Sequence, residues 1–398
     1  MQWIKIDEVL FFQEGPGVRN TQYTSAGVKL LNVANLVDGK VDLSTSDRYI
    51  SEEEAYGKYK HFLCDEGDFI VASSGIKVEY IDKKMGFIEK SMLPLCMNTS
   101  TIRFKVKNPD ILRIRYFMYY LKSQHFKSQL ARYITGSAQL NYGPSHLKKM
   151  VMPLASIEKQ DEIVEKLDCL QNAINIREQQ LAKLDDLVKS RFIELFGMPG
   201  TDAFGWGLVP LGSICNINPK KSLDSRLVSG AVVSFVPMPA VTEHGEIDAT
   251  AIKEYDEVKT GFTYFAENDV LFAKITPCME NGKGAVAKGL HNGIGFGSTE
   301  FHVLRPISGK SDPYWIYTLT AFSQFRMDAA SNMTGSAGQR RVPASFLENY
   351  RVSLPPIALQ EQFAAFVEQT DKSKLAVKQS LEKLETLKKS LMQQYFGV

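Results

Sequence analysis

The chain has 398 residues, of which 44% are hydrophobic and 23% are charged, a composition of folded domains that excludes a largely disordered chain. Its 47 basic and 45 acidic side chains give a formal charge of +2 at pH 7, which neither requires nor excludes nucleic acid, because a basic face can exist within a balanced total. Apolar runs stay below the ~18 residues that cross a membrane, and the N-terminus lacks a signal-peptide pattern, so we expect a cytoplasmic protein with no membrane partner.

Residues 1–155 predict a mixed domain of short strands and helices. Strands are expected at Phe69–Ala72 and Thr101–Val106, where β-branched and aromatic residues are bounded by turn residues. A helix is expected over residues 114–130. We interpret its aromatic stripe as core rather than as a base-stacking surface: Tyr116, Phe117, Tyr119 and Tyr120.

Residues 156–200 predict one long helix with a coiled-coil seam, because apolar residues recur at alternating steps of four and three. The seam positions are Ile163, Leu167, Leu170, Ile174, Arg177, Leu181, Leu184, Val188, Arg191 and Leu195. Pro153 opposes an earlier start, Ser156 is the expected N-cap, and Gly197 is expected to take the left-handed conformation after the last turn. A helix of about 40 residues is about 60 Å long, which suits a spacer.

The second part of the chain repeats the first. The tract TGSAQLNYGPSHL from Thr135 recurs as TGSAGQRRVPASFL from Thr334, and EGDFIVA from Glu66 recurs as ENDVLFA from Glu267. We therefore expect two copies of one module, each a mixed domain followed by a long helix.

The second copy predicts a mixed domain over residues 201–357 and a long helix over residues 358–398, closed by Gly397. Within the domain we expect a strand at residues 301–304, an aromatic helix at 313–327 and glycine-rich loops at 281–297 and 335–338. The predicted fold class is α+β: two tandem-repeat mixed α/β domains separated by two long coiled-coil helices.

Motifs of catalysis and metal binding are missing from the sequence. The five cysteines are widely spaced and never form C-x-x-C, so we expect buried free thiols, and the six histidines show no metal spacing. Neither G-x-S-x-G nor G-x-x-x-x-G-K-[ST] occurs. Asp312-Pro313-Tyr314-Trp315 is one proline short of the loop with which amino-methyltransferases hold a flipped adenine, and proline at a helix N1 position explains it. We expect no catalytic residue, metal or cofactor in this chain.

The informative loops are polar and related by the repeat. They are SSGIK (73–77), NTS (98–100) and QLNY (139–142) in the first copy, and KITPCMENGKG (274–284), GSTE (297–300) and GQRR (338–341) in the second. Such groups bond phosphates and base edges, with Arg or Lys suited to guanine and Asn or Gln to adenine. One frame with different loop residues suggests two domains that read two different targets.

Over its whole length the sequence resembles the specificity subunit of Type I restriction-modification systems. The resemblance rests on the two-copy layout, on L-P-P-x-x-x-Q-E-Q at residues 354–362 and M-P-L-x-x-x-E-K-Q at 152–160, on the TGSA loops, and on the tracts KITPCMENGKG and GFGSTEFHVLRP. It implies a chain that catalyses nothing, whose two target-recognition domains, inverted relative to each other, are held apart by an antiparallel pair of long helices. Each domain would grip one half of a bipartite double-stranded DNA site. The implied partners are two modification subunits, which bind S-adenosylmethionine and methylate adenine, and restriction subunits that use ATP and magnesium.

We expect the DNA contacts to come from loop side chains. They are Ser74, Lys77, Asn98, Thr99, Gln139, Asn141 and Tyr142 in the first domain, and Lys274, Thr276, Asn281, Lys283, Ser298, Thr299, Gln339, Arg340 and Arg341 in the second. An ordinary loop group that faces solvent or bonds backbone is the open alternative for each.

Two other classes of function stay open. A self-contained DNA methyltransferase or nuclease would need cofactor-binding or metal-carboxylate motifs, which the sequence lacks. A coiled-coil tether with two protein-binding domains would not lose DNA affinity steeply with salt, whereas phosphate contacts release counterions.

Overall fold

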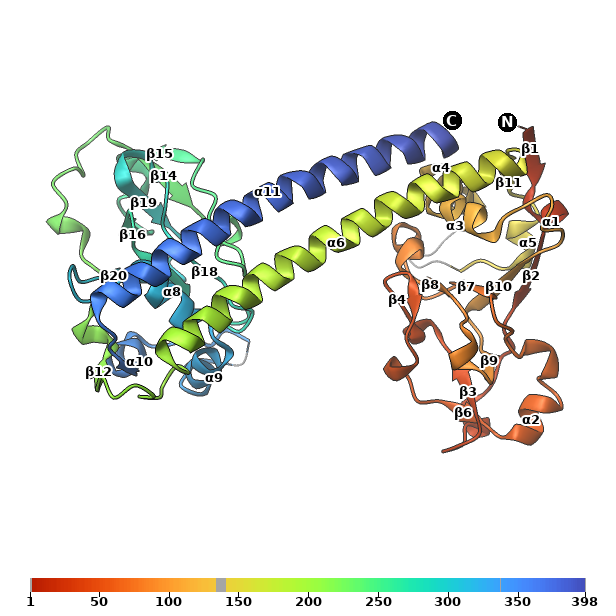
Figure 1. Cartoon of the computed structure of the whole chain (residues 1–398), viewed down its shortest axis with the longest axis horizontal. Coiled ribbons are helices and arrows are strands. Elements are labelled where there is room, and N and C mark those ends of the chain that lie inside the picture. Colours follow the sequence, from red (N-terminus) through yellow and green to blue (C-terminus); the bar gives the residue numbers. More distant parts are fainter. Residues whose placement is uncertain (1, 134–140, 337, 398) are drawn as a thin grey trace. The chain divides into compact units, whose positions relative to one another are not determined.

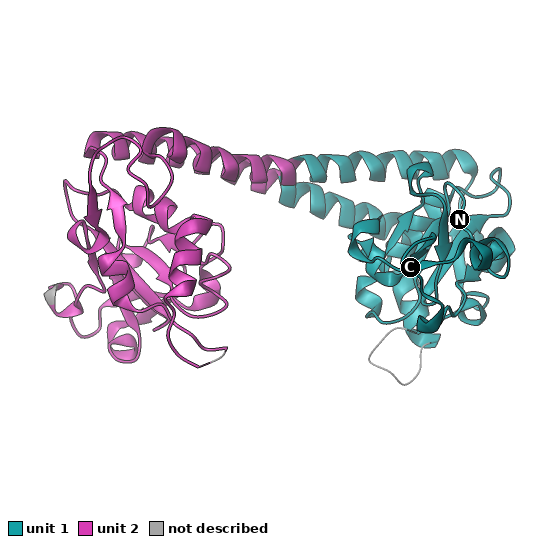
Figure 2. Ribbon diagram, turned by 90° about the horizontal axis from the view of Figure 1, so that it is seen from below, with its two compact units in different colours: residues 1–176, 381–398 teal, residues 177–380 magenta. Residues whose placement is uncertain are grey.

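The computed structural model of the chain describes residues 2–133, 141–336 and 338–397. It divides into two compact units, coloured separately in Figure 2: unit 1 is Met1–Ile176 with Leu381–Val398, and unit 2 is Arg177–Ser380. Each unit therefore contains one mixed domain and a part of both long helices.

Each unit is built on a four-stranded antiparallel sheet with the same strand order. In unit 1 the order is β2 (Leu10–Glu14), β10 (Thr101–Val106), β7 (Phe69–Ala72) and β8 (Met85–Phe87). In unit 2 it is β13 (Cys215–Ile217), β20 (Phe301–Pro306), β17 (Val270–Ala273) and β18 (Gly284–Val286). The register also agrees, since Phe104 lies opposite Phe69 and Leu304 lies opposite Val270. The sequence repeat is a structural repeat, and the predicted strands are confirmed.

A second sheet in each unit contains one parallel pair of strands. In unit 1, β3 (Val28–Leu31) is parallel to β9 (Leu95–Met97) and antiparallel to β6 (Tyr49–Ile50). In unit 2, β14 (Val232–Val236) is parallel to β19 (Ile294–Gly297), with β15 (Ile252–Glu254) and β16 (Thr263–Ala266) at the edges. The carboxyl ends of two parallel strands lie at the same end of a sheet. The loop after β9 therefore starts beside the loop after β3, and the loop after β19 starts beside the loop after β14.

The remaining elements are short. They are β1 (Gln2–Lys5) paired with β11 (Val151–Leu154), β12 (Leu208–Pro210) paired with β21 (Arg351–Ser353), β4 (Leu36–Val37) paired with β5 (Lys40–Val41), and the helices α1 (Ile6–Val9), α2 (Glu52–Tyr56), α5 (Pro144–Leu147), α7 (Tyr255–Val258) and α10 (Ala344–Asn349).

The aromatic helices expected at 114–130 and 313–327 are each broken in two. They form α3 (Ile114–Lys122) with α4 (Gln124–Tyr133), and α8 (Pro313–Ala321) with α9 (Ser323–Ser331). Ser123 and Phe322 separate the pairs, with extended backbones at ψ 153° and 142°. Ser123 also caps α4, because its Oγ accepts a hydrogen bond from Phe126 N–H at 3.2 Å. Pro313 stands at the first turn of α8 with Asp312 as N-cap, so the helix-start interpretation of that tetrapeptide is confirmed.

The aromatic stripes are core, as expected. Tyr116, Phe117, Tyr119 and Tyr120 of α3 are buried in one cluster with the four-stranded sheet, and Trp315 of α8 is buried in the matching cluster of unit 2.

The glycine-rich segment 281–297, expected to be a loop, contains strands β18 and β19. Two of its glycines are needed for close packing. A Cβ on Gly295 would lie 2.1 Å from the ring of Phe265, and one on Gly297 would lie 2.2 Å from the carbonyl oxygen of Val236. Here glycine marks a strand that another chain segment approaches closely, not a turn.

The long helices are α6 (Ile157–Phe196) and α11 (Ile357–Phe396), each unbroken over 40 residues (Figure 1). Ser156 caps α6, because its Oγ accepts from Lys159 N–H at 3.4 Å, and Gly197 has the expected positive φ of 77°. The same expectation for Gly397 is wrong, since that glycine does not adopt a left-handed φ. Every seam position predicted for α6 is buried or half-buried.

Both helices start with an equivalent buried glutamine. The Gln160 Oε1 accepts from the backbone N–H that precedes α3 at 2.9 Å, and its Nε2 donates to two carbonyls at 2.9 Å. The Gln360 side chain makes the same three bonds at the start of α8, at 3.0, 3.1 and 2.9 Å. The motif comparison had matched Gln160 with Gln362, but Gln362 is exposed. The true equivalence is set by these hydrogen bonds.

Candidate nucleic-acid interface

Three loops meet where the two central strands of the four-stranded sheet end in each unit, and we call this place the loop edge. In an antiparallel pair the end of one strand lies beside the start of the other, so the loop after β7 meets the loop before β10, and the loop after β17 meets the loop before β20. The third loop joins through a β-bridge, from Ser74 to Asn141 in unit 1 and from Ile275 to Arg341 in unit 2. The structure thus brings together the polar loops that the sequence singled out.

The loop edge of unit 1 is held by uncharged groups. The Ser74 hydroxyl donates to the Ser100 hydroxyl at 2.6 Å, and Tyr142 N–H donates to the Ser73 carbonyl at 3.0 Å. Thr99 is exposed beside them. This surface offers hydroxyl and amide groups to a ligand.

Two predicted contact residues of unit 1 are buried. Asn98 and Tyr142 are each 1% exposed. The Asn98 amide donates to Asn32 Oδ1 at 2.8 Å, and its own oxygen accepts from Thr99 N–H at 2.8 Å, so it supports the loop from below. Burial raises the pKa of Tyr142, which stays a neutral phenol. Neither side chain reaches the surface, which corrects the expectation of direct contact.

Of the other predicted residues of unit 1, Ser74 is half-buried and Lys77 and Asn141 are exposed. Gln139 lies outside the described residues.

The loop edge of unit 2 is charged. The Arg341 guanidinium donates to both oxygens of Glu300, with Nη2–Oε1 at 2.7 Å and Nε–Oε2 at 2.9 Å. This contact holds the pKa of Glu300 below its ordinary value. Arg340 lies near Glu280, with Nη2 3.5 Å from Oε1. Burial lowers the pKa of the neighbouring Lys274.

Several predicted contact groups of unit 2 bond the loops themselves. The Thr276 hydroxyl donates to the Gly338 carbonyl at 3.1 Å and accepts from Arg340 N–H at 3.2 Å. Ser298 Oγ accepts from Glu300 N–H at 3.2 Å. These hydroxyls fix the loop conformation.

The remaining predicted residues of unit 2 differ in exposure. Lys283 is half-buried, with Nζ 3.5 Å from a backbone carbonyl, whereas Asn281, Thr299 and Gln339 are exposed. The exposed three are free to meet a ligand.

Sequence reasoning missed two residues at this edge. Glu300 carries an acid, which is not expected to face phosphates, although the repeat aligns it with Ser100. His302 was read only as a possible metal ligand, yet its Nε2 lies 2.8 Å from the Val342 carbonyl and its Nδ1 lies 3.0 Å from Asn218 Nδ2. Because a carbonyl can only accept, Nε2 carries the proton, and the neutral ring ties the third loop to strand β20.

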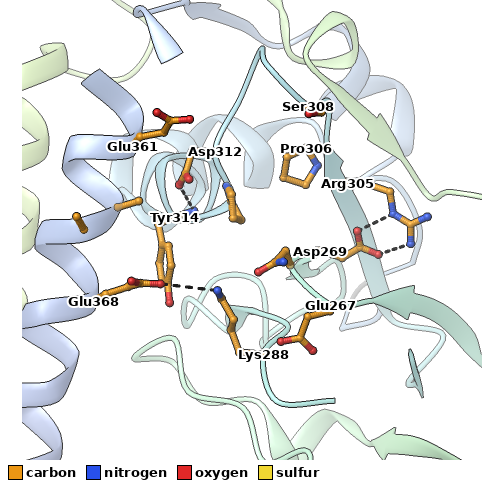
Figure 3. A pocket seen from close by; sticks show the side chains of 14 residues that line it. Glu267, Asp269, Lys288, Arg305, Pro306, Ser308, Asp312, Tyr314, Glu361 and Glu368 are labelled. Carbon is orange, nitrogen blue, oxygen red and sulfur yellow. Dashed lines mark hydrogen bonds and ion pairs between the residues drawn. The ribbon is translucent and has the colours of Figure 1, made fainter. Parts of the chain in front are cut away.

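The opposite end of the same sheet in unit 2 borders a cavity of about 580 Å³ (Figure 3). Most of its charged groups are engaged within the protein. Arg305 donates to both oxygens of Asp269 at 2.7 and 2.6 Å, Asp312 caps α8, and Lys288 lies 3.8 Å from Glu368. We interpret this cavity as a packing gap between the sheet and the helices, not as a ligand site.

Neither a metal-ligand cluster nor a membrane-spanning helix occurs in the described part of the chain. Within residues 2–133, 141–336 and 338–397, no group of three or more His, Cys, Asp and Glu side chains is placed to hold a metal ion. None of the helices described there has an apolar stretch that would cross a bilayer. The cysteines are free thiols, but only Cys64, Cys96 and Cys215 are buried, whereas Cys169 is exposed and Cys278 is half-buried.

Comparison with known families agrees with the repeat. The model of the Type I restriction modification DNA specificity domain matches the chain twice, over residues 18–186 and 204–387. The chain belongs to this family. Its two matches fall one on each copy of the module, so each copy is a specificity domain of that family.

Relatives of the family match part of their own length. The specificity subunit of Type I restriction enzyme EcoEI from Escherichia coli is 36% identical over 241 residues, which cover 58% of this chain and 39% of the relative. That of EcoAI, also from Escherichia coli, is 34% identical over 247 residues, covering 59% of this chain and 41% of the relative. The aligned stretch thus spans about two fifths of these relatives.

Solved structures share the fold over the whole chain. The S subunit of a Type I restriction-modification system from M. genitalium superposes with a TM-score of 0.56 at 16% identity, covering 99% of this chain and 96% of that one. A chain of another type I R-M system gives 0.53 at 17% identity, covering 99% and 97%.

Proposed function

We propose that this chain is a non-catalytic, sequence-specific DNA-recognition subunit that reads a bipartite double-stranded site, one half with each domain. One observation carries the proposal: the loop edge recurs in both units on the same backbone but with different side chains. Base edges are told apart by the donors and acceptors that meet them, so two half-sites of different sequence need two different sets of loop groups. The similarity to specificity subunits of Type I restriction enzymes supports the same conclusion.

The long helices would set the distance between the half-sites. We propose target-recognition domains at residues 1–155 and 201–357, with spacer helices at 156–200 and 358–398 forming an antiparallel coiled coil. Contacts within each unit support this pairing. The start of α6 packs with the end of α11 in unit 1, where Ile163 and Phe396 share a core, and Phe192 meets Phe363 at 5.5 Å between ring centroids in unit 2.

A spacer of fixed length explains why two weak readers suffice. Each good bidentate base contact discriminates by about 1–3 kcal/mol. Joining two readers at the correct spacing makes the second binding step effectively intramolecular, and a wrong gap abolishes that advantage.

The chemistry in this proposal belongs to partners in the cytoplasm. Two modification subunits would bind S-adenosylmethionine and take the flipped adenine into their own pocket. Restriction subunits, using ATP and magnesium, would complete the assembly. The chain itself would supply the address and the scaffold.

Selection from a random DNA library tests the proposal. The full chain, together with the modification subunit that co-purifies with it, should enrich a split sequence with a constant gap. The logarithm of its affinity should fall linearly with the logarithm of salt concentration, because phosphate contacts release counterions. A protein that enriches no sequence and binds DNA without salt dependence would be a protein tether instead.

A further inference from the structure

The loop edge of unit 2 contains a carboxylate where unit 1 has a hydroxyl. Glu300 occupies the position of Ser100, just before the central strand of the four-stranded sheet, and Arg341 occupies that of Asn141. In unit 1 the position is neutral, since Ser100 accepts from Ser74. Unit 2 thus has a carboxylate beside a guanidinium at a place where unit 1 has only neutral side chains.

An acid at this position needs an explanation if the surface meets DNA, because a carboxylate repels phosphates. The simplest explanation is a structural one, in which Glu300 only orients Arg341. The pair is accessible, however: the side chain of Glu300 is 25% exposed and that of Arg341 is 42% exposed. A carboxylate has about four acceptor sites, and the guanidinium occupies two of them.

The remaining acceptor sites have a matching donor on only some bases. In the major groove cytosine presents its N4 amino group and adenine its N6 amino group, whereas guanine and thymine present acceptors that a carboxylate repels. The pairing partner separates the first two, because thymine, the partner of adenine, offers an arginine only O4 beside a methyl group. Guanine, the pairing partner of cytosine, presents the O6 and N7 acceptors that suit an arginine. Arg341 keeps one unused N–H on Nη1 and one on Nη2, because its Nε and Nη2 bond Glu300 and its Nη1 donates to the Gln339 carbonyl at 3.2 Å. Fixed side by side, the carboxylate acceptor and these two donors complement the two edges of one C·G pair.

We propose that Glu300 is a specificity-determining residue of unit 2, which accepts a hydrogen bond from the amino group of cytosine while Arg341 faces the guanine of the same pair. This inference rests on the proposed function and adds the base pair that this site selects. Lys274 N–H donates to the Glu300 carbonyl at 2.9 Å, and Ser298 Oγ accepts from Glu300 N–H, so the backbone under the carboxylate is fixed before DNA arrives.

The test is sequence selection with the wild type and Glu300→Gln, in complex with the co-purifying modification subunit. The wild type should hold a C·G pair at one position of the second half-site. Glutamine keeps the size but adds donors, and it suits adenine, so Glu300→Gln should lower the preference for C·G about tenfold or more and raise A·T at that position alone. Glu280→Gln is the matched control, because Glu280 lies in the neighbouring loop with only a 3.5 Å contact to Arg340, and it should leave the preference unchanged.

Other outcomes separate the two proposals. If Glu300→Gln changes affinity equally for all sequences, the carboxylate has a structural role and this inference fails while the proposed function stands. If the wild type enriches no split sequence, the proposed function itself fails. Glu300→Asp keeps the charge but withdraws the carboxylate by one methylene, so it should weaken the C·G preference even if the glutamine variant is poorly folded.

Discussion

The two loop edges occupy one backbone frame and differ in charge. Unit 1 presents Ser74, Ser100 and Asn141, whereas unit 2 presents Glu300 and Arg341 on the matching strand ends. At the starts of the long helices the units agree, because the buried Gln160 and Gln360 make the same three hydrogen bonds. Residues that pair buried polar groups are restricted, because those groups need hydrogen-bond partners. Side chains of the exposed loops have no such requirement, so they can differ between the two copies.

A second difference concerns the buried aspartate at the end of the sheet opposite the loop edge. In unit 1, Asp68 has two cations, with Arg103 at 3.1 Å and Lys105 at 3.1 Å. In unit 2, Asp269 is paired with Arg305 at 2.6 Å. The equivalent buried carboxylate is therefore neutralised by two cations in unit 1 and by one cation in unit 2.

The shared glutamines give the largest expected effect. Gln360→Leu removes the partner of one backbone N–H and two carbonyls, at about 1–3 kcal/mol for each group, so the free energy of unfolding should fall by at least about 3 kcal/mol. Urea unfolding measures it. Gln362→Leu, at the exposed position that the motif suggested, should change it by less than about 0.5 kcal/mol. Equal losses in both variants would mean that the assigned equivalence is wrong.

The aspartate pairs should respond unequally. Arg305→Met leaves a buried carboxylate unpaired and should cost about 3–5 kcal/mol of unfolding free energy. Lys105→Met should cost about 1 kcal/mol, because Arg103 still neutralises Asp68. Thermal unfolding of the two variants makes the comparison, and a cost for Lys105→Met as large as that for Arg305→Met would show that Arg103 alone does not neutralise Asp68.

Removing the arginines of the third loop should affect one half-site. Replacing Arg340 and Arg341 together by alanine removes two cations and leaves Glu300 unpaired, so affinity for the second half-site should fall at least about tenfold while protection of the first half-site is retained. Footprinting measures both halves at once. Arg351→Ala, an exposed arginine of β21 outside the three loops, serves as control. Unchanged protection of the second half-site by the double variant would sink the assignment.

The smallest effect expected is the pH dependence of unfolding that His302 gives to unit 2. Burial lowers the pKa of His302 from its ordinary value of 6.5, so the folded state prefers the neutral ring. The free energy of unfolding is unaffected by His302 above pH 6.5, where the ring is neutral in both states. It falls as the pH drops below 6.5 toward the lower pKa of the folded state, by at most about 1.4 kcal/mol per pH unit. His302→Ile, which copies Ile102 of unit 1, should flatten this slope in urea unfolding between pH 7.5 and 5.5. An identical slope in both proteins would contradict the neutral buried ring.

Much of the architecture was predictable because it follows from local patterns. The repeat, the seam of the long helices and their starts appear in the spacing of apolar residues, proline and capping groups. The breaks at Ser123 and Phe322 were not predictable, because apolar spacing continues across them. Strand β19 was not predictable, because its glycines are required by close packing against Phe265 and Val236, which are distant in sequence.

The candidate site was predictable as loops but not as side chains. Antiparallel pairing at adjacent strand ends gathers the loops whatever their sequence. Which side chains face outward depends on packing from elsewhere: Asn98 is buried because Asn32 and the carboxyl end of β3 lie against it. Glu300 was missed because an acidic residue is not expected beside phosphates, and its pairing with Arg341, 41 residues later, appears only in the folded chain.

The most direct test of the account is a genome-wide map of methylated adenines in cells with and without this chain. The account predicts a split motif with a constant gap that disappears when the chain is deleted. Exchange of residues 201–357 for the corresponding domain of a relative should change one half of the motif and leave the other half and the gap intact. Methylation that persists unchanged without the chain would contradict its role as the reader of the site.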